Sequence, residues 1–129
     1  MAFTPNSIEI THFMNPNKFF FKYTYLNDNS IEQMQMRLDE ILNTNSHYNS
    51  TFFSELKENT KVAYFCKPNW IRCQVDKITI INNVQTVIMW SLDYGYPIRI
   101  TSYKMIKHLP SEWHDIPSPI FCGGLNVSM

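Results

Sequence analysis

Cysteine and histidine are the residue types of this chain best suited to nucleophilic or metal chemistry, and their spacing argues against both. The chain has Cys66, Cys73, Cys122, His12, His47, His108 and His114. The cysteines lack the close pairing of zinc ligands, and the histidines are scattered. A catalytic cysteine also needs a nearby base, for which no sequence signature exists here. We therefore predict no catalytic residue, no metal site and no cofactor.

Motifs of the common active sites are missing as well. The sequence has no G-x-S-x-G, no Walker-type phosphate loop, no H-E-x-x-H and no glycine-rich dinucleotide turn. An enzyme is therefore not expected, and a binding module is favoured.

Composition points to one globular domain that is rich in strands. The chain has 129 residues, of which 44% are hydrophobic, which suits one packed domain. Aromatic residues reach 15%, a composition typical of pleated strand faces. Lys+Arg and Asp+Glu number 11 each, so the chain lacks the basic excess typical of proteins that bind phosphate backbones.

Three further features bear on the cellular compartment. The three cysteines form an odd and sparse set, which favours a reducing compartment over a disulfide framework. The N-terminus has no basic start followed by an apolar run, so no signal peptide is expected. No apolar stretch approaches the ~18 residues of a membrane helix. The sequence thus predicts a soluble, intracellular protein.

Hydrophobic periodicity predicts two strands at the N-terminal end, Ser7–Met14 and Lys18–Tyr25. In the first strand, Ile8, Ile10 and His12 should share one face. The second strand has aromatic residues on both faces, which indicates that both sides are covered.

A helix should follow from Ser30, where Ser30 and Gln33 fit a capping box. Apolar residues then recur at helical spacing, at Ile31, Met34, Leu38, Ile41 and Leu42. The next segment, His47–Leu56, fits either a short helix or an anchored loop.

The central part of the chain reads as a series of strands. They are expected at Lys61–Phe65, Trp70–Ile81, Val84–Leu92 and Tyr96–Thr101. Asn82-Asn83 should form a two-residue hairpin turn, because asparagine accepts a positive φ. Tyr103–Leu109 should be a short strand or a 3₁₀ turn, and Ile120-Phe121-Cys122 one more strand. This layout is typical of a small, strongly bent antiparallel barrel.

The stretch from Val62 to Pro110 resembles the Tudor domain. The family pattern A-x-F … x-W-x-R-A-x-V … x-D-Y-G-N … L-x-x-L-P has counterparts in Ala63, Phe65, Trp70, Arg72, Val75, Asp93, Tyr94, Gly95, Ile106, Leu109 and Pro110. The resemblance implies an SH3-like barrel that reads peptides and does no chemistry. Trp70, Arg72, Asp93 and Gly95 would then be structural residues of the barrel.

The flanks resemble the extended Tudor domain, in which the barrel is joined to a second, staphylococcal-nuclease-like barrel. The implied fold is mainly β with one linker helix: an SH3-like Tudor barrel with flanking, incomplete nuclease/OB-like strands. Residues 1–56 would form the N-terminal hairpin and linker helix, residues 57–110 the Tudor barrel, and residues 111–129 the return segment. A narrower resemblance points to insect proteins of the Piwi-interacting-RNA pathway, of the Yb type.

In this family, methylated arginine binds in a cage of four aromatic walls. Phe65 and Tyr94 match the first and fourth walls, whereas Ile71 and Ser91 stand at the second and third. Tyr96 replaces the asparagine that orients the guanidinium. Each wall contributes roughly 0.5–2 kcal/mol through cation–π contact. The loss of two walls should therefore weaken methylarginine recognition.

Trp90 could rebuild the cage if a β-bulge near Ser91 turned its side chain to the wall position, since successive strand residues point to opposite faces. Three functions stay open. The incomplete cage favours a protein-interaction module without methyl recognition. The alternatives are a symmetric dimethylarginine reader with a rebuilt cage, and a single-stranded RNA-binding module that stacks bases on Phe19, Phe20, Phe21 and Tyr23.

The resemblance also implies partners and a cellular setting. The expected partner is a protein or peptide, with an arginine-containing segment of a Piwi-clade protein as the first candidate. RNA and self-association are alternatives, and no membrane contact is expected. The implied setting is germline RNA silencing, in cytoplasmic and perinuclear RNA–protein granules.

Overall fold

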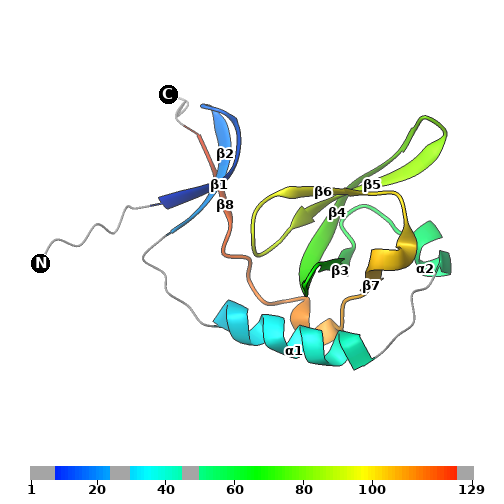
Figure 1. Ribbon diagram of the computed structural model, residues 1–129. Coiled ribbons are helices and arrows are strands. Elements are labelled where there is room, and N and C mark those ends of the chain that lie inside the picture. The colour runs from blue at the N-terminus through cyan, green and yellow to red at the C-terminus, as the bar shows by residue number, and fades with distance from the viewer. Residues whose placement is uncertain (1–7, 24–29, 45–49, 125–129) are drawn as a thin grey trace, which may run out of the picture.

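The computed structural model describes residues 8–23, 30–44 and 50–124, which form two antiparallel sheets and a long helix (Figure 1). The smaller sheet has the order β1-β2-β8, with β1 Ile8–Asn15, β2 Lys18–Tyr23 and β8 Phe121–Gly123. The larger sheet has the order β6-β5-β4-β3-β7. Its strands are β3 Lys61–Cys66, β4 Asn69–Ile81, β5 Val84–Ser91, β6 Pro97–Ile100 and β7 Ile106–His108.

The expected mainly β fold is confirmed, and most strand bounds agree with the sequence to within one or two residues. The ambiguous segment contains a short helix, α2 Ser50–Ser54. Tyr103–Leu109 holds both predicted alternatives, a 3₁₀ turn η1 Tyr103–Met105 followed directly by β7. A second such turn, η2 Ser111–Trp113, starts the return to β8. The expected end of the second strand and the capping side chain of Ser30 lie outside the described residues.

The larger sheet curls around an apolar core, and the side chains of β5 alternate between its two faces from Val87 to Ser91. On β5, Val87, Met89 and Ser91 are fully buried, whereas Ile88 and Trp90 on the opposite face are half-buried. The hairpin between β4 and β5 turns at Asn82 and Asn83, whose φ values of 52° and 65° are positive as predicted. Within the described ranges, no helix is long and apolar enough to cross a membrane.

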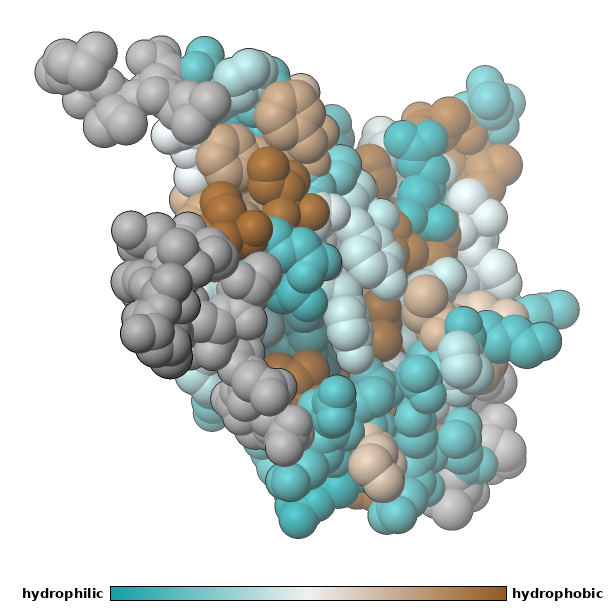
Figure 2. All heavy atoms as spheres, turned by 60° about the vertical axis from the view of Figure 1, so that its left-hand side comes forward, coloured by the Kyte–Doolittle hydropathy of each residue, from teal (hydrophilic) through white to brown (hydrophobic). Residues whose placement is uncertain are grey.

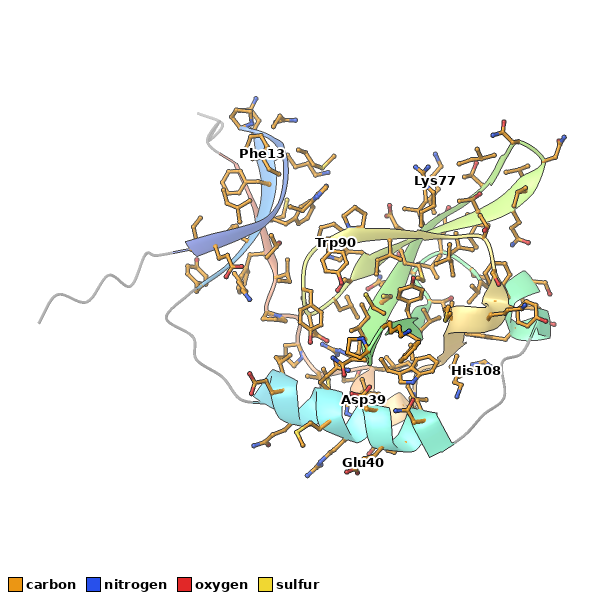
Figure 3. The ribbon with its side chains drawn as sticks, in the orientation of Figure 1. Phe13, Asp39, Glu40, Lys77, Trp90 and His108 are labelled. Atoms are coloured by element: carbon orange, nitrogen blue, oxygen red, sulfur yellow. The ribbon has the colours of Figure 1, made fainter. Side chains whose placement is uncertain are left out.

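The long helix, α1 Ser30–Thr44, closes one end of the barrel. Met34, Leu38 and Leu42 pack with Trp70 and Trp113 in a second apolar cluster. Figure 3 shows Asp39 on the barrel side of the helix and Glu40 on its outer side. Ile41, expected in the apolar stripe, is instead exposed. The apolar face of α1 that contacts the barrel is therefore narrower than the apolar stripe predicted from the sequence.

A buried ion pair joins the barrel to the return segment. Arg72 donates from Nε and Nη2 to the two carboxylate oxygens of Asp93, at 2.9 and 2.6 Å. Its Nη1 donates to the main-chain carbonyls of Trp113 and Ile116, at 2.9 and 2.7 Å. Both charged side chains are almost completely shielded from solvent. One guanidinium thereby connects β4, the turn after β5 and the segment that leads to β8.

The smaller sheet departs from the sequence prediction at His12. The β1–β2 register shifts between Ile10 and His12, so Ile10 pairs with Phe21 and His12 pairs with Phe20. The bulge at Thr11 turns His12 to the face opposite Ile10, and the expected common face of Ile8, Ile10 and His12 is therefore wrong. Apolar side chains gather on this sheet, among them the exposed Ile8, Ile10, Phe13 and Phe121 (Figure 2).

Candidate functional site

The end of the barrel next to α1 carries the two tyrosines that the sequence assigned to the candidate cage. Tyr94 is half-buried and its hydroxyl donates to Oε1 of Gln35 at 3.2 Å. The Tyr96 hydroxyl lies 3.7 Å from Sγ of Cys66. Burial raises the pKa of the Tyr94 phenol, and the Asp93, Asp39 and Glu32 carboxylates raise it further. Burial and the Cys66 hydrogen bond likewise raise the pKa of Tyr96. Both rings therefore stay neutral at physiological pH.

The second and third wall positions lie inside the barrel. Ile71 is 4% exposed and belongs to the central apolar cluster. Ser91 is 0% exposed, and its hydroxyl has no hydrogen-bond partner in the part of the chain that the structure describes. Neither side chain offers a ring, and neither opens to solvent. These two positions cannot form walls of an aromatic cage.

Phe65, at the first wall position, lies on the α1 side of the strand. It pairs with Trp70 across the β3–β4 hairpin, and the two ring centroids are 5.3 Å apart. Phe65 also packs at the edge of the cluster that holds α1 against the barrel. The candidate cage residues therefore fall into three groups. Tyr94 and Tyr96 are neutral tyrosines, Ile71 and Ser91 are buried in the barrel, and the ring of Phe65 packs at the edge of the cluster under α1.

The Trp90 side chain does not point toward the candidate cage. Around Ser91 the β4–β5 register is regular, with Cys73 opposite Ser91, Gln74 opposite Trp90 and Val75 opposite Met89. The bulge in this ladder lies instead between Val75 and Lys77. The rebuilt cage that required a bulge near Ser91 therefore has no structural basis here, because Trp90 stays on the outer face of β5.

Trp90 packs instead against the smaller sheet. Its ring centroid lies 4.3 Å from that of Phe20 and 5.9 Å from that of His12. In Figure 3 it stands in the space between the β1–β2 hairpin and the barrel. This contact explains the aromatic residues on both faces of β2, since Phe20 meets the barrel while Phe19 and Phe21 face the other way.

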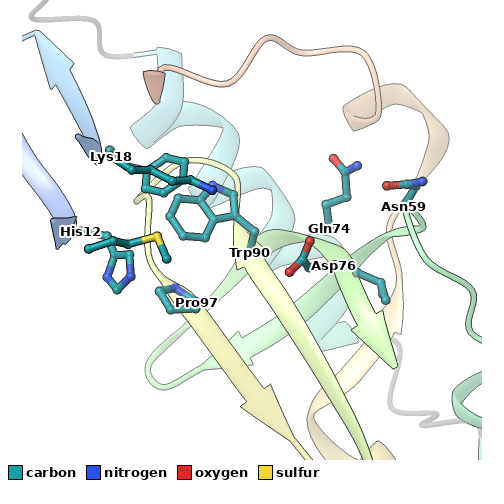
Figure 4. A pocket seen from close by; sticks show the side chains of 10 residues that line it. His12, Lys18, Asn59, Gln74, Asp76, Trp90 and Pro97 are labelled. Atoms are coloured by element: carbon teal, nitrogen blue, oxygen red, sulfur yellow. The ribbon is translucent and has the colours of Figure 1, made fainter. Parts of the chain in front are cut away.

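A groove of about 460 Å³ runs between the two sheets beside Trp90 (Figure 4). The hairpin contributes His12, Lys18 and Phe20, and the barrel contributes Gln74, Asp76 and Trp90. No local sequence pattern predicted which residues line this groove, because its walls come from segments far apart in the chain. On α1, the sequence did contain a sign of a residue near the candidate cage. Gln35 is a polar residue that interrupts the apolar stripe at a barrel-facing position. Its amide hydrogen-bonds to the hydroxyl of Tyr94 and to the main-chain carbonyl of Trp70.

The turn after β5 contacts the smaller sheet through Gly95. Its φ is 72°, and a Cβ at this position would collide with the side chain of Thr11. We expect Gly95→Ala to lower the free energy of unfolding by roughly 1–3 kcal/mol, from the left-handed backbone and the lost close approach. Urea denaturation measures the change.

The two causes can be separated with a second variant. Thr11→Ala in the Gly95→Ala background removes the closest contact, with Oγ1 of Thr11, but not the backbone strain, so it should recover part of the loss. Equal stabilities of the wild-type protein and Gly95→Ala would contradict the close approach.

The cysteines and histidines that the structure describes do not assemble into a metal site. Among the described residues, no group of three or more His, Cys, Asp or Glu side chains could hold an ion. Cys73 is fully buried, and burial raises the pKa of its thiol well above the usual range. The protonated thiol is a poor nucleophile, as expected for a core residue.

Known structures share this architecture. A Drosophila melanogaster Papi extended Tudor domain variant, holding a symmetrically dimethylated Piwi N-terminal peptide, matches 92% of this chain and 59% of its own length, at 16% identity and a TM-score of 0.71. The same variant with the unmethylated peptide matches 92% and 57%, at 16% identity and a TM-score of 0.72. A complex of Tudor with dimethylated Aubergine matches 89% and 63%, at 19% identity and a TM-score of 0.65.

These similarities establish the fold. The chain spans about three fifths of the length of the solved structures it matches. Among curated proteins, no sequence relative matches it. The Tudor domain family, in contrast, matches residues 5–122, which is nearly the whole chain. With the barrel, the linker helix and the second sheet in place, this chain has the fold of the extended Tudor structures and belongs to the Tudor domain family.

Proposed function

We propose that this protein is a non-catalytic interaction module that binds an arginine-containing segment of a protein partner and does not require arginine methylation. Its partner would be a Piwi-clade or other small-RNA-pathway protein, for which it acts as an adaptor. The proposed setting is germline RNA silencing, in cytoplasmic and perinuclear RNA–protein granules.

The burial of Ile71 and Ser91 is the observation that carries this proposal. A methylated guanidinium gains affinity from aromatic faces that surround it, and each face is worth roughly 0.5–2 kcal/mol. With two of four wall positions inside the barrel core, most of that gain is lost. Tyr96 at the asparagine position also replaces the amide that would orient the ligand.

The choice of an arginine-containing partner is supported by the neighbouring structures. The Papi and Tudor domains of similar fold hold Piwi and Aubergine peptides, and the Papi variant holds its peptide with and without methylation. The formal net charge of zero argues against binding driven by nucleic-acid phosphates.

Calorimetric titration tests the proposal. We expect a Piwi N-terminal peptide to bind with a Kd that changes by no more than about threefold, in either direction, on symmetric dimethylation of its arginine. A threefold change corresponds to about 0.7 kcal/mol, near the lower limit of what one aromatic wall contributes. The matched control is the same peptide with alanine at the arginine position, which should not bind.

Other outcomes identify a different function. A dimethylated peptide that binds tenfold or more tightly than the unmodified one would establish a methylarginine reader. Equal weak heats for all three peptides would remove the arginine-binding function altogether.

A further inference from the structure

We propose that the groove between the two sheets binds the guanidinium of an unmodified arginine from the partner, with Trp90 and Asp76 as its receptor. This assignment rests on the proposed peptide-binding function and names a site for it away from the candidate cage. Ser91 points into the barrel and Trp90 points out of it, so the two sites lie on opposite faces of β5.

The β-bulge in β4 builds the carboxylate side of this receptor. Val75 pairs with Met89 and Lys77 pairs with Ile88, which leaves Asp76 as the extra residue. A bulge bends its strand and redirects the side chain of the extra residue. Here the redirected side chain lines the groove on the same wall as Trp90 (Figure 4).

The polar side chains of the barrel wall are available to a ligand. Asp76 forms no ion pair, and the side chains of Gln74 and Asn59 form no hydrogen bond, within the described ranges of the chain. All three line the groove (Figure 4). A carboxylate accepts two parallel hydrogen bonds from a guanidinium, and the amide oxygens of Gln74 and Asn59 can accept others.

The aromatic side of the receptor is held in place before any ligand arrives. Trp90 lies 4.3 Å from Phe20 and 5.9 Å from His12, centroid to centroid, so contacts from the other sheet fix its ring. The indole remains half-buried and not fully covered. A planar guanidinium stacks well on such a surface, with cation–π attraction added to the ion pair.

Lys18 on the opposite wall sets the direction of the bound segment. Its ammonium has no ion-pair partner among the described residues and lines the groove from the hairpin. An ammonium only donates hydrogen bonds, so it suits main-chain carbonyl oxygens. An arginine segment therefore fits with its side chain toward Asp76 and its main chain toward Lys18.

Arginine methylation should weaken this site. Asp76 recognises the guanidinium through paired N–H donors, and a methyl group on each terminal nitrogen removes one donor while leaving the charge. A cage would show the opposite preference. The groove thus supplies a physical reason for a Tudor domain that favours the unmodified residue.

Nuclear magnetic resonance of the ¹⁵N-labelled protein tests the site with a small probe, N-acetyl-arginine methylamide. The indole N–H of Trp90 should shift on titration, whereas those of the buried Trp70 and Trp113 should not. The neutral isostere N-acetyl-citrulline methylamide should give no saturable shift. The symmetrically dimethylated probe should bind about threefold more weakly, through lost hydrogen bonds.

Two variants locate the effect. Asp76→Asn should raise the Kd of the arginine probe about fivefold, the value of one partly exposed ion pair, with no change in thermal stability. Glu40→Gln is the matched control, because it removes a carboxylate from the outer side of α1, and should leave the Kd unchanged.

The failure of this site and that of the proposed function can be told apart. An Asp76→Asn variant that binds the probe as well as the wild-type protein would overturn the groove assignment, as would shifts confined to Tyr94 and Tyr96. If the Piwi N-terminal peptide still binds in that case, the interaction function stands and only its location changes. A probe and a peptide that both fail to bind would overturn the two proposals together.

Discussion

Replacing Asp93 by alanine should lower the free energy of unfolding by about 3–5 kcal/mol, because it leaves the Arg72 guanidinium buried and without its counter-charge. The pair is bidentate and both side chains are almost fully shielded from solvent. Domains of this size are commonly stable by only ~5–15 kcal/mol, so the loss removes a large share of the total. Urea denaturation followed by tryptophan fluorescence measures it.

The exposed ion pair between Lys22 and Glu9 provides the control. Its charged atoms are 3.7 Å apart and its side chains are 40% and 58% exposed. Glu9→Ala should therefore change the free energy of unfolding by less than about 1 kcal/mol. Equal losses from Asp93→Ala and Glu9→Ala would show that the Arg72–Asp93 pair does not hold the barrel to the return segment.

Trp70→Ala should cost a similar amount, about 3–5 kcal/mol, for a different reason. Trp70 is 1% exposed and occupies the centre of the cluster between the barrel and α1. Its Nε1 donates to Oδ1 of Asn43 at 2.9 Å, and its main-chain N–H donates to Oδ1 of Asp39 at 2.7 Å. Loss of the ring opens a cavity under the helix, so circular dichroism should show lower helicity at moderate urea.

A graded series separates packing from hydrogen bonding at this position. Trp70→Phe keeps a ring but loses the bond to Asn43, and Asn43→Ala loses only that bond. Each bond is worth about 1 kcal/mol, so Asn43→Ala should be the mildest of the three changes and Trp70→Ala the most severe. A Trp70→Ala protein that unfolds within 1 kcal/mol of the wild type would mean that α1 docks independently of the indole.

Local patterns were sufficient to predict the strands and the long helix. Alternation along β5, the paired asparagines of its hairpin and the apolar stripe of α1 are all short-range signals, and the structure follows them. His12 and Asp76 escaped prediction because each depends on a β-bulge, which shifts the face of a side chain without changing residue types. Bulges are set by pairing with another strand, so one strand's sequence does not reveal them.

The candidate cage could likewise be predicted from the sequence only in part. The positions of Phe65, Ile71, Ser91, Tyr94 and Tyr96 could be assigned by motif, and their residue types indicated an incomplete cage. The role of Trp90 could not be assigned in this way, because its neighbours Phe20 and His12 come from the other sheet. The groove exists only through the approach of two distant segments, which no local pattern encodes.

The pairing of β8 with β2 determines the order in which parts of the protein can fold during synthesis. Of the strands that the structure describes, β1 and β2 leave the ribosome first, the strands of the barrel follow, and β8 comes after them. An isolated two-stranded hairpin is marginally stable in water, so β1 and β2 must wait for the barrel and then for β8. The β1–β2 hairpin forms one wall of the groove between the two sheets. The proposed arginine site in that groove is therefore complete only after β8 has left the ribosome.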